Sequence, residues 1–151
     1  MRHTTASLVI LAFLVGTAAT SAQSEPMTPT LFVAAYEDAR ASQNWDIVAP
    51  LIHDDCVATF TSGTYRGKNE VEVIFRRNFA SIKGEHYAIT NVHWVKQSDG
   101  FAVFTFDYQW SGVIAGKSAS GGGRGSSVIV KSGTGWQLIS EHLGPPAPKQ
   151  P

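Results

Sequence analysis

From Gly84 onward, the chain has the pattern of β-strands and no helical periodicity. Apolar and polar side chains alternate, β-branched and aromatic residues are frequent, and turn residues occupy 98–100 and 132–135. The run 121–123 is all glycine, which suits either a flexible loop or a bent strand close to other backbone. We therefore predict four strands in this half of the chain, over 87–96, 101–110, 123–131 and 136–142. Any helices must come earlier in the sequence.

Helical patterns do occupy the preceding segment. Thr28 before Pro29 predicts an N-cap and a first helical residue, and the apolar spacing then continues to about Ser42. Asn44 predicts a second helix to 51–52, which Pro50 kinks or shortens and the pair Asp54–Asp55 ends. A third helix, stopped by Gly84, follows from five positions that share one helical face, namely Val71, Ile74, Phe75, Asn78 and Ile82.

Two short strands, over 57–61 and 64–65, separate the second and third helices. Helices that are segregated from most of the strands are typical of the α+β class. We expect three N-terminal helices packed on a curved, mostly antiparallel sheet. Such a sheet, wrapped around a long helix, encloses a conical cavity.

Residues 1–22 have the order of a secretory signal peptide. A short positive start precedes the apolar run 8–15 and the small residues 16–22. The apolar run is far shorter than the roughly 20 residues that span a bilayer, and no later segment is a candidate span. We expect cleavage after Ala22 and a secreted or periplasmic protein, with no membrane association after removal. The mature chain would have a disordered leader (23–27), one domain (28–144) and a disordered Pro-rich tail (145–151).

The charge and cysteine content exclude several classes of partner. Removal of residues 1–22 would leave 11 Lys+Arg against 12 Asp+Glu, a formal net charge of −1. A nearly neutral chain without a basic run gives no electrostatic reason to bind nucleic acid or anionic lipid. Cys56 is the single cysteine, so no internal disulfide forms. We interpret it as a small buried hydrophobe, with a reactive or intermolecular thiol as the alternative.

No cofactor or metal site is expected. The spacing of His86 and His93 is not one that binds metal, and no cluster of Cys, His and Asp supports them. The run 121–125 lacks the strand–glycine–helix context of a phosphate or dinucleotide loop. We therefore predict no metal and no cofactor.

Three stretches resemble one known family. They are Asn44–Asp46 leading to Leu51–Asp55, the turn YRGKNE over 65–70, and the closing strand GWQLISEH over 135–142. With these, the chain is similar to the SnoaL-like branch of the nuclear transport factor 2-like superfamily over residues 28–144. The resemblance implies a cystatin-like fold. It leaves the activity open, because this superfamily includes isomerases, cyclases, dehydratases, epoxide hydrolases and non-enzymatic binding or assembly modules.

The resemblance also argues against one specific chemistry. In the similar ketosteroid isomerases a first-helix tyrosine donates a hydrogen bond, and Tyr36 matches that position. Their general base would fall near Phe60, which cannot act, and their second acid would come from the strand around 120–128. Residues 113–131 contain no Asp or Glu. Steroid isomerase chemistry is therefore not expected, and Tyr36 alone is more often a core tyrosine whose hydroxyl is hydrogen-bonded.

Strand alternation suggests a different set of site residues. It places Trp136, Leu138, Ser140 and His142 on one face, so an inward Trp136 directs His142 toward the cavity. Arg124 would line the same pocket, with Tyr36 at its wall, as an anion- or carbonyl-binding site. The alternative is an Arg and a His at an exposed sheet edge or dimer contact. Glu141 falls on the opposite face and is expected at the surface or in an interface.

Asp107 is the one carboxylate in an aromatic strand, and the sequence does not decide whether its side chain points to solvent or into the cavity. On a solvated outer face it has no catalytic role, whereas beside the cavity it is the best base candidate. The family's epoxide hydrolases place an Arg between two carboxylates, and Asp107, Arg124 and Glu141 supply those residue types. We expect the apolar walls of the pocket to come from four aromatic residues, namely Phe60, Phe75, Tyr108 and Trp110.

Three functions remain open from the sequence. The first is an exported domain that binds a small, largely apolar molecule in the conical pocket. The second is a cofactor-free isomerase, lyase or hydrolase that uses Tyr36, Asp107, Arg124 and His142. The third is a homodimeric assembly module, since the open sheet face of this fold commonly pairs.

Overall fold

A computed structural model describes residues 27–133 and 135–148. The elements follow in the order α1 (Pro29–Ala41), α2 (Trp45–Val48), the 3-10 helix η1 (Ala49–Leu51), β1 (Ile52–Phe60), β2 (Gly63–Arg66), α3 (Lys68–Ser81), β3 (Lys83–Gln97), β4 (Phe101–Ile114), β5 (Lys117–Ser132) and β6 (Gly135–Gly144). The expected signal peptide and most of the expected leader lie outside the described residues, so both stay predictions. None of the helices in the described ranges is long and apolar enough to cross a bilayer.

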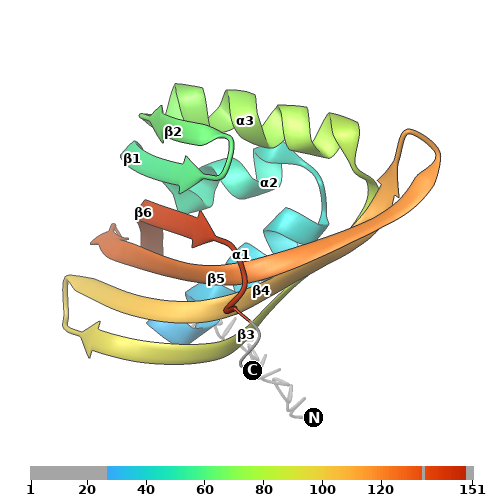
Figure 1. Ribbon diagram of the computed structural model, residues 1–151. Coiled ribbons are helices and arrows are strands. Elements are labelled where there is room, and N and C mark those ends of the chain that lie inside the picture. Colours follow the sequence, from blue (N-terminus) through green and yellow to red (C-terminus); the bar gives the residue numbers. More distant parts are fainter. Residues whose placement is uncertain (1–26, 134, 149–151) are drawn as a thin grey trace, which may run out of the picture.

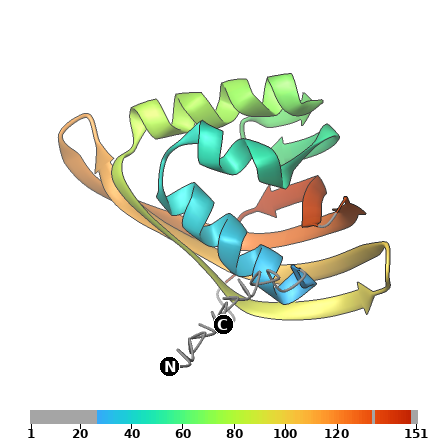
Figure 2. The same ribbon diagram turned by 180° about the vertical axis from the view of Figure 1, so that it is seen from behind.

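The strands form one curved sheet in the order β2-β1-β6-β5-β4-β3. The β1–β6 pair is parallel and the other pairs are antiparallel. All three helices lie on the concave side of the sheet, with α3 above β1 and β2 (Figure 1). Seen from behind, α1 runs along the inside of the long strands (Figure 2). The predicted α+β fold is therefore confirmed. The predicted strands were too short, since β4 extends as far as Ile114 and β5 already begins at Lys117.

The starts of the first two helices are capped as the sequence predicts. The Thr28 hydroxyl oxygen accepts from the Leu31 amide at 3.2 Å, and the Asn44 side-chain oxygen accepts from the Asp46 amide at 3.0 Å. The end of the second helix was predicted wrongly. The helix α2 stops at Val48, Pro50 lies in η1, and Asp54 and Asp55 belong to strand β1 instead of ending a helix.

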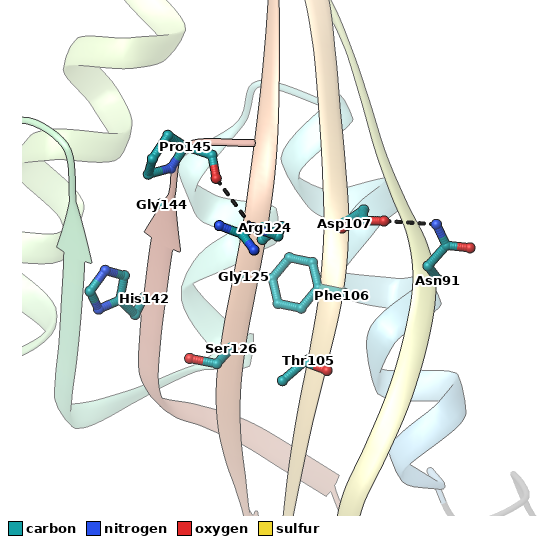
Figure 3. A pocket seen from close by; sticks show the side chains of 10 residues that line it. All are labelled: Asn91, Thr105, Phe106, Asp107, Arg124, Gly125, Ser126, His142, Gly144 and Pro145. Carbon is teal, nitrogen blue, oxygen red and sulfur yellow. Dashed lines mark hydrogen bonds between the residues drawn. The ribbon is translucent and has the colours of Figure 1, made fainter. Parts of the chain in front are cut away.

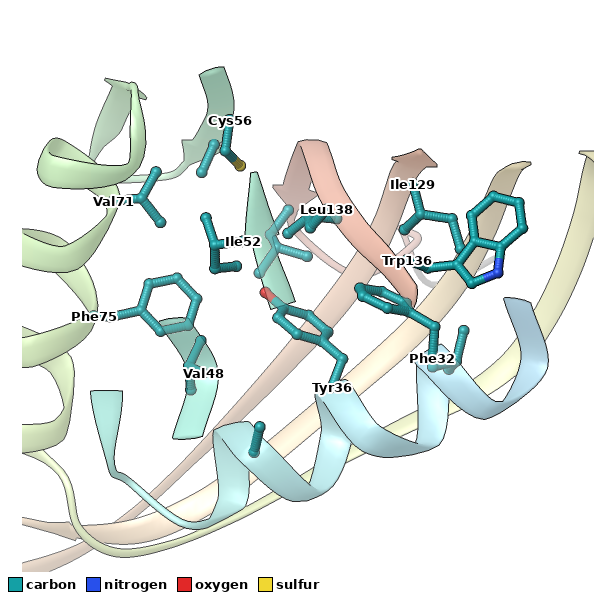
Figure 4. Close-up of a cluster of buried hydrophobic side chains, with 14 of the residues drawn as sticks. Phe32, Tyr36, Val48, Ile52, Cys56, Val71, Phe75, Ile129, Trp136 and Leu138 are labelled. Carbon is teal, nitrogen blue, oxygen red and sulfur yellow. The ribbon is translucent and has the colours of Figure 1, made fainter. Parts of the chain in front are cut away.

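The hydrophobic core lies between α1, α3 and the concave face of the sheet (Figure 4). Phe32 of α1, Ile52 of β1 and Ile129 of β5 are each fully buried there. Burial of a large apolar side chain stabilises the fold by about 1.5–3 kcal/mol. Cys56 is also fully buried, which confirms the prediction of a buried thiol. Burial raises its pKa to about 12, so the thiol stays protonated at neutral pH.

A β-bulge in β6 decides which side chains of this strand point inward. Val128 of β5 pairs with Ser140, whereas the next residue, Ile129, pairs with Leu138. Ile139 is thus an extra residue, and an extra residue exchanges the two faces of the strand after it. Trp136 and Leu138 are buried before the bulge, and Glu141 and Leu143 are buried after it.

The glycine-rich part of β5 is a strand packed under aromatic rings, so the flexible-loop reading is wrong. Three of its glycines pair directly with aromatic residues of β4, as Trp110–Gly121, Tyr108–Gly123 and Phe106–Gly125. A methyl group at Gly121 would lie 2.7 Å from the Trp110 indole nitrogen, and one at Gly125 would overlap the Phe106 ring. Glycine is thus needed where the β4 rings lie across the neighbouring strand.

Candidate functional site

Three of the four predicted catalytic residues lie on the outer, convex face of the sheet. Asp107, Arg124 and His142 line one shallow pocket there, together with residues such as Asn91 and Ser126 (Figure 3). Tyr36, the fourth, is buried on the concave side, in α1. The prediction that Arg124 and His142 share a pocket with Tyr36 is therefore wrong. For His142 the cause is the bulge at Ile139, which turns it outward.

The same bulge overturns the prediction for Glu141. Its side chain points into the protein and is only 1% exposed, whereas an exposed or interfacial position was expected. The carboxylates and Arg of the epoxide-hydrolase pattern consequently do not converge, because Glu141 lies on the concave face and Asp107 and Arg124 on the convex one.

The outer pocket holds its charged groups in partly solvated positions. Asn91 donates a hydrogen bond to the Asp107 carboxylate at 2.7 Å, and the Arg124 Nε donates to the Pro145 carbonyl at 3.5 Å. Asp107 and Arg124 are direct partners across β4 and β5. Both Arg124 and His142 are exposed, so water screens the charges, and no buried reaction centre forms at this surface.

A second, inner cavity opens on the concave side, between α3, the end of β1 and strands β3 and β4. Its volume is about 250 Å³. Three of the predicted apolar wall residues line it, namely Phe60, Tyr108 and Trp110. Phe75, the fourth, belongs to the hydrophobic core and is only 2% exposed. Two polar residues that the sequence analysis did not select, Arg40 and Tyr87, also line this cavity.

Arg40 is held in place by a buried polar network beneath the cavity. Its Nη1 lies 3.6 Å from the Glu141 Oε2 and donates to the Tyr36 hydroxyl at 3.5 Å. The Tyr36 hydroxyl donates to Glu141 at 3.1 Å, and the Ser127 hydroxyl donates to the other Glu141 oxygen at 3.4 Å. Helix α1 and strands β5 and β6 therefore fix the position of one guanidinium group.

Aromatic rings surround the rest of that guanidinium. Its central carbon lies 4.1 Å from the centre of the Tyr87 ring and 4.9 Å from the centre of the Phe75 ring. A cation over a ring face is attracted by the ring's quadrupole, more strongly where water is excluded. Phe75 therefore contributes to the site from below, by supporting Arg40.

Burial sets the protonation behaviour of this network. It raises the pKa of Glu141, although Arg40 and the hydrogen bonds from Tyr36 and Ser127 oppose the rise. Burial alone would lower the pKa of Arg40, but Tyr87, Tyr36 and Glu141 outweigh it and the pKa is raised. The pKa of Tyr87 is also raised by burial. Arg40 therefore remains a cation, and the Tyr87 hydroxyl keeps its proton at neutral pH.

Two polar atoms beside the cavity have no hydrogen-bond partner in the described residues. They are the Nε of Arg40 and the hydroxyl oxygen of Tyr87. Arg40 is 8% exposed and Tyr87 is 2% exposed. An unsatisfied buried polar group costs about 1–3 kcal/mol, so such groups in a native protein require an explanation. Both residues line the cavity, which makes a polar group of a ligand a candidate for the missing partner.

Glu85 and Arg77 also line the inner cavity and add charge to it. Burial raises the pKa of the Glu85 carboxyl, and Arg40 opposes the rise. Arg77 donates to the Tyr65 hydroxyl at 3.4 Å. No group of three or more His, Cys, Asp or Glu side chains suited to a metal ion occurs within 27–133 and 135–148. The cavity thus combines charged groups and hydrogen-bond donors with aromatic walls.

Comparisons with known proteins identify the family. The sequence model of the SnoaL-like domain family matches residues 30–148. This match covers most of the chain, which therefore belongs to the SnoaL-like domain family. No curated protein sequence matches the chain.

Solved structures share the fold at low sequence identity. A nuclear transport factor 2-like superfamily protein from Salmonella enterica superposes with a TM-score of 0.72 at 18% identity, over 79% of this chain and 89% of that one. A cystatin-like protein from Caulobacter vibrioides gives 0.64 at 16%, over 75% and 83%. One from Nostoc punctiforme gives 0.64 at 14%, over 78% and 92%. At these identities the likeness concerns the fold, and function has to be argued from the site.

Proposed function

We propose that the protein binds a small, largely apolar molecule in the inner cavity, with a polar group of the ligand directed at Arg40 and Tyr87. The observation that carries this proposal is the pair of unpartnered polar atoms, the Arg40 Nε and the Tyr87 hydroxyl oxygen. They belong to residues that line a cavity otherwise walled by Phe60, Tyr108 and Trp110. Apolar walls with a few placed polar groups are the usual composition of a small-molecule site.

A two-ring aromatic ketone, 2-acetonaphthone, is a suitable first probe. We expect it to raise the melting temperature of the mature chain, because a ligand that binds only the folded state stabilises it. Tyr87→Phe removes one proposed hydrogen bond and should weaken binding about fivefold to tenfold. His142→Ala changes the outer pocket and should leave the affinity unchanged. Loss of binding in His142→Ala, with retention in Tyr87→Phe, would contradict the proposal.

Catalysis by Tyr36, Asp107, Arg124 and His142 is not part of the proposal. Tyr36 is buried on the concave side of the sheet, and the other three line the outer pocket. Acid–base and nucleophilic catalysis require groups within hydrogen-bond reach of one reacting centre. A sheet that separates them removes the basis for that mechanism.

A second candidate function is assembly of a homodimer through the outer face. The helices lie on the other side of the sheet (Figures 1 and 2), and the outer face carries Asp107 directly opposite Arg124. In a two-fold symmetric pair, Asp107 of each chain can approach Arg124 of the other. Asp107→Arg should then convert a dimer into a monomer in sedimentation, whereas Asp99→Arg in the exposed β3–β4 turn should not. A wild-type chain that sediments as a monomer at high concentration would exclude this function.

The proposal also includes export, because residues 1–22 have the sequence pattern of a signal peptide. A chain expressed with these residues should be recovered outside the cytoplasm with Gln23 as its first residue. Mass spectrometry of the recovered protein measures this directly. Full-length chain retained in the cytoplasm would contradict export, and would leave the binding proposal unaffected.

A further inference from the structure

We infer that the inner cavity selects neutral molecules with a hydrogen-bond acceptor and discriminates against anions, because Glu141 compensates the charge of Arg40 from beneath. This inference rests on the proposed binding function and adds the ligand's charge class to it. Arg40 alone would indicate an anion site, since a guanidinium usually pairs with carboxylate or phosphate. The surroundings of Arg40 lead to a different conclusion.

The charge of Arg40 already has a partner. The Glu141 carboxylate lies 3.6 Å from the Arg40 Nη1, and its side chain is fully buried. A ligand anion next to Arg40 would therefore also experience the nearby negative charge of Glu141. The anion would also lose its hydration on entering the cavity. Because Arg40 is already paired with Glu141, its attraction to the anion does not offset that desolvation energy. Glu85, on the wall of the same cavity, adds a second carboxyl group that disfavours an anion. Arg77 also lines the cavity, but it is exposed, so water screens its charge more strongly.

The groups left free are hydrogen-bond donors. The unpartnered Arg40 atom is the Nε, and a guanidinium nitrogen can donate but cannot accept. The Tyr87 hydroxyl is also unpartnered and can donate its proton. Both residues line the same cavity, and donors of this kind suit an acceptor such as the oxygen of a ketone, ester or amide. A neutral oxygen loses far less hydration energy on burial than an anion does.

The walls define the remainder of the ligand. Tyr87 and Tyr108 stack with ring centres 6.2 Å apart, and Phe60 and Trp110 also line the cavity, whose volume is about 250 Å³. Flat aromatic surfaces favour a planar apolar body through stacking. The inferred ligand class is thus a planar, apolar, uncharged molecule with one exposed acceptor oxygen.

Three naphthalene probes that differ only at position 2 test the inference. They are 2-acetonaphthone (a neutral acceptor), 2-naphthalenesulfonate (an anion) and 2-ethylnaphthalene (no acceptor). We expect wild-type protein to bind the ketone at least about tenfold more tightly than either other probe, because the buried Glu141 carboxylate repels the sulfonate and 2-ethylnaphthalene leaves the donors without a partner. Glu141→Gln should tighten sulfonate binding about tenfold or more. Asp107→Asn, which removes a carboxylate on the outer face, should change neither affinity.

A pH series gives the same answer without a variant, in case Glu141→Gln does not fold. The sulfonate stays charged throughout, and burial raises the pKa of Glu141. The affinity of the sulfonate for wild-type protein should therefore rise as Glu141 becomes protonated, when the pH is lowered from about 7 toward the ordinary glutamate value of about 4.3. The groups that face Glu141 come from every element around it: Tyr36 and Arg40 from α1, Cys56 from β1, Tyr87 from β3, Tyr108 from β4 and Ser127 from β5. Glu85 also titrates near Arg40, and the series repeated in Glu85→Gln isolates the contribution of Glu141.

The outcomes distinguish a failure of the proposed binding function from a failure of the inferred charge preference. If none of the three probes binds, the proposed function fails and the inference falls with it. If wild-type protein binds the sulfonate as tightly as the ketone, the inference is overturned while the binding function stands. Equal affinity for 2-ethylnaphthalene and the ketone would remove the role assigned to the two donors.

Discussion

Replacing Arg40 with Met should lower the free energy of unfolding by about 3–5 kcal/mol, the range found when one member of a buried ion pair is removed. The substitution leaves the Glu141 carboxylate fully buried with only the Tyr36 and Ser127 hydroxyls as partners. Met keeps much of the apolar stem of Arg40, so the loss arises mainly from the uncompensated charge. Chemical denaturation of the chain from Gln23 onward measures it.

The double variant Arg40→Met/Glu141→Leu provides the thermodynamic cycle. It removes both charges and should recover most of the stability lost in the single variant, because two apolar side chains can replace a buried pair. Arg76→Met is a matched surface control. Arg76 pairs with Asp46 and Glu72, but it is largely exposed, and its loss should cost about 0–1 kcal/mol. A loss below about 1 kcal/mol in Arg40→Met would show that the pair is not buried as described.

The pH dependence of the Arg40→Met variant follows from the raised pKa of Glu141. Burial holds that pKa above its unfolded value, and removal of Arg40, which opposes the rise, must lift it further. The folded chain then binds the proton more tightly than the unfolded chain does, so stability falls as the pH rises from the unfolded pKa toward the folded one. The defect of Arg40→Met should therefore become smaller as the pH is lowered from about 7 toward the ordinary glutamate value of about 4.3.

The second large effect is expected at Gly123, where Gly123→Ala should lower the free energy of unfolding by at least about 2 kcal/mol. A methyl group there would overlap the backbone carbonyl oxygen of Gly144 and lie 2.9 Å from the Tyr108 hydroxyl oxygen. A backbone group in a paired strand cannot move aside as a flexible side chain can. The strain would also displace Tyr108, a wall of the inner cavity, so 2-acetonaphthone should bind more weakly.

Gly100→Ala is the control for this substitution. A methyl group at Gly100 meets nothing within 4 Å, and its stability should stay within about 0.5 kcal/mol of wild type. Equal stability of Gly123→Ala and Gly100→Ala would contradict the close packing of β5 against the end of β6.

Local sequence signals predicted the fold well. The caps at Thr28 and Asn44 are short-range features, since each side chain satisfies an amide two or three residues away. The four long strands follow from alternation that is visible in any short window. The second helix failed because Ile52 pairs with Leu138, and a tertiary contact of this kind has no local signature.

The side-chain faces were the part that the sequence could not supply. One extra residue at Ile139 exchanges Glu141 and His142 between the two sides of the sheet, and a bulge is defined by its pairing with β5 rather than by its own residues. The sequence does contain a signal for Arg40. Arg40 lies four residues after Tyr36, so both occupy the face of α1 that packs on the sheet, and a charged residue on a buried face requires a partner.

The most direct test of the central claim is where a ligand binds. In an NMR titration of the isotope-labelled chain from Gln23 onward with 2-acetonaphthone, we predict that the largest shifts occur at Tyr87, Trp110 and the Arg40 Nε–H. The signals of Asp107 and His142 should stay unchanged. Shifts confined to the outer pocket, around Asp107, Arg124 and His142, would contradict an inner binding site and place the ligand on the convex face of the sheet.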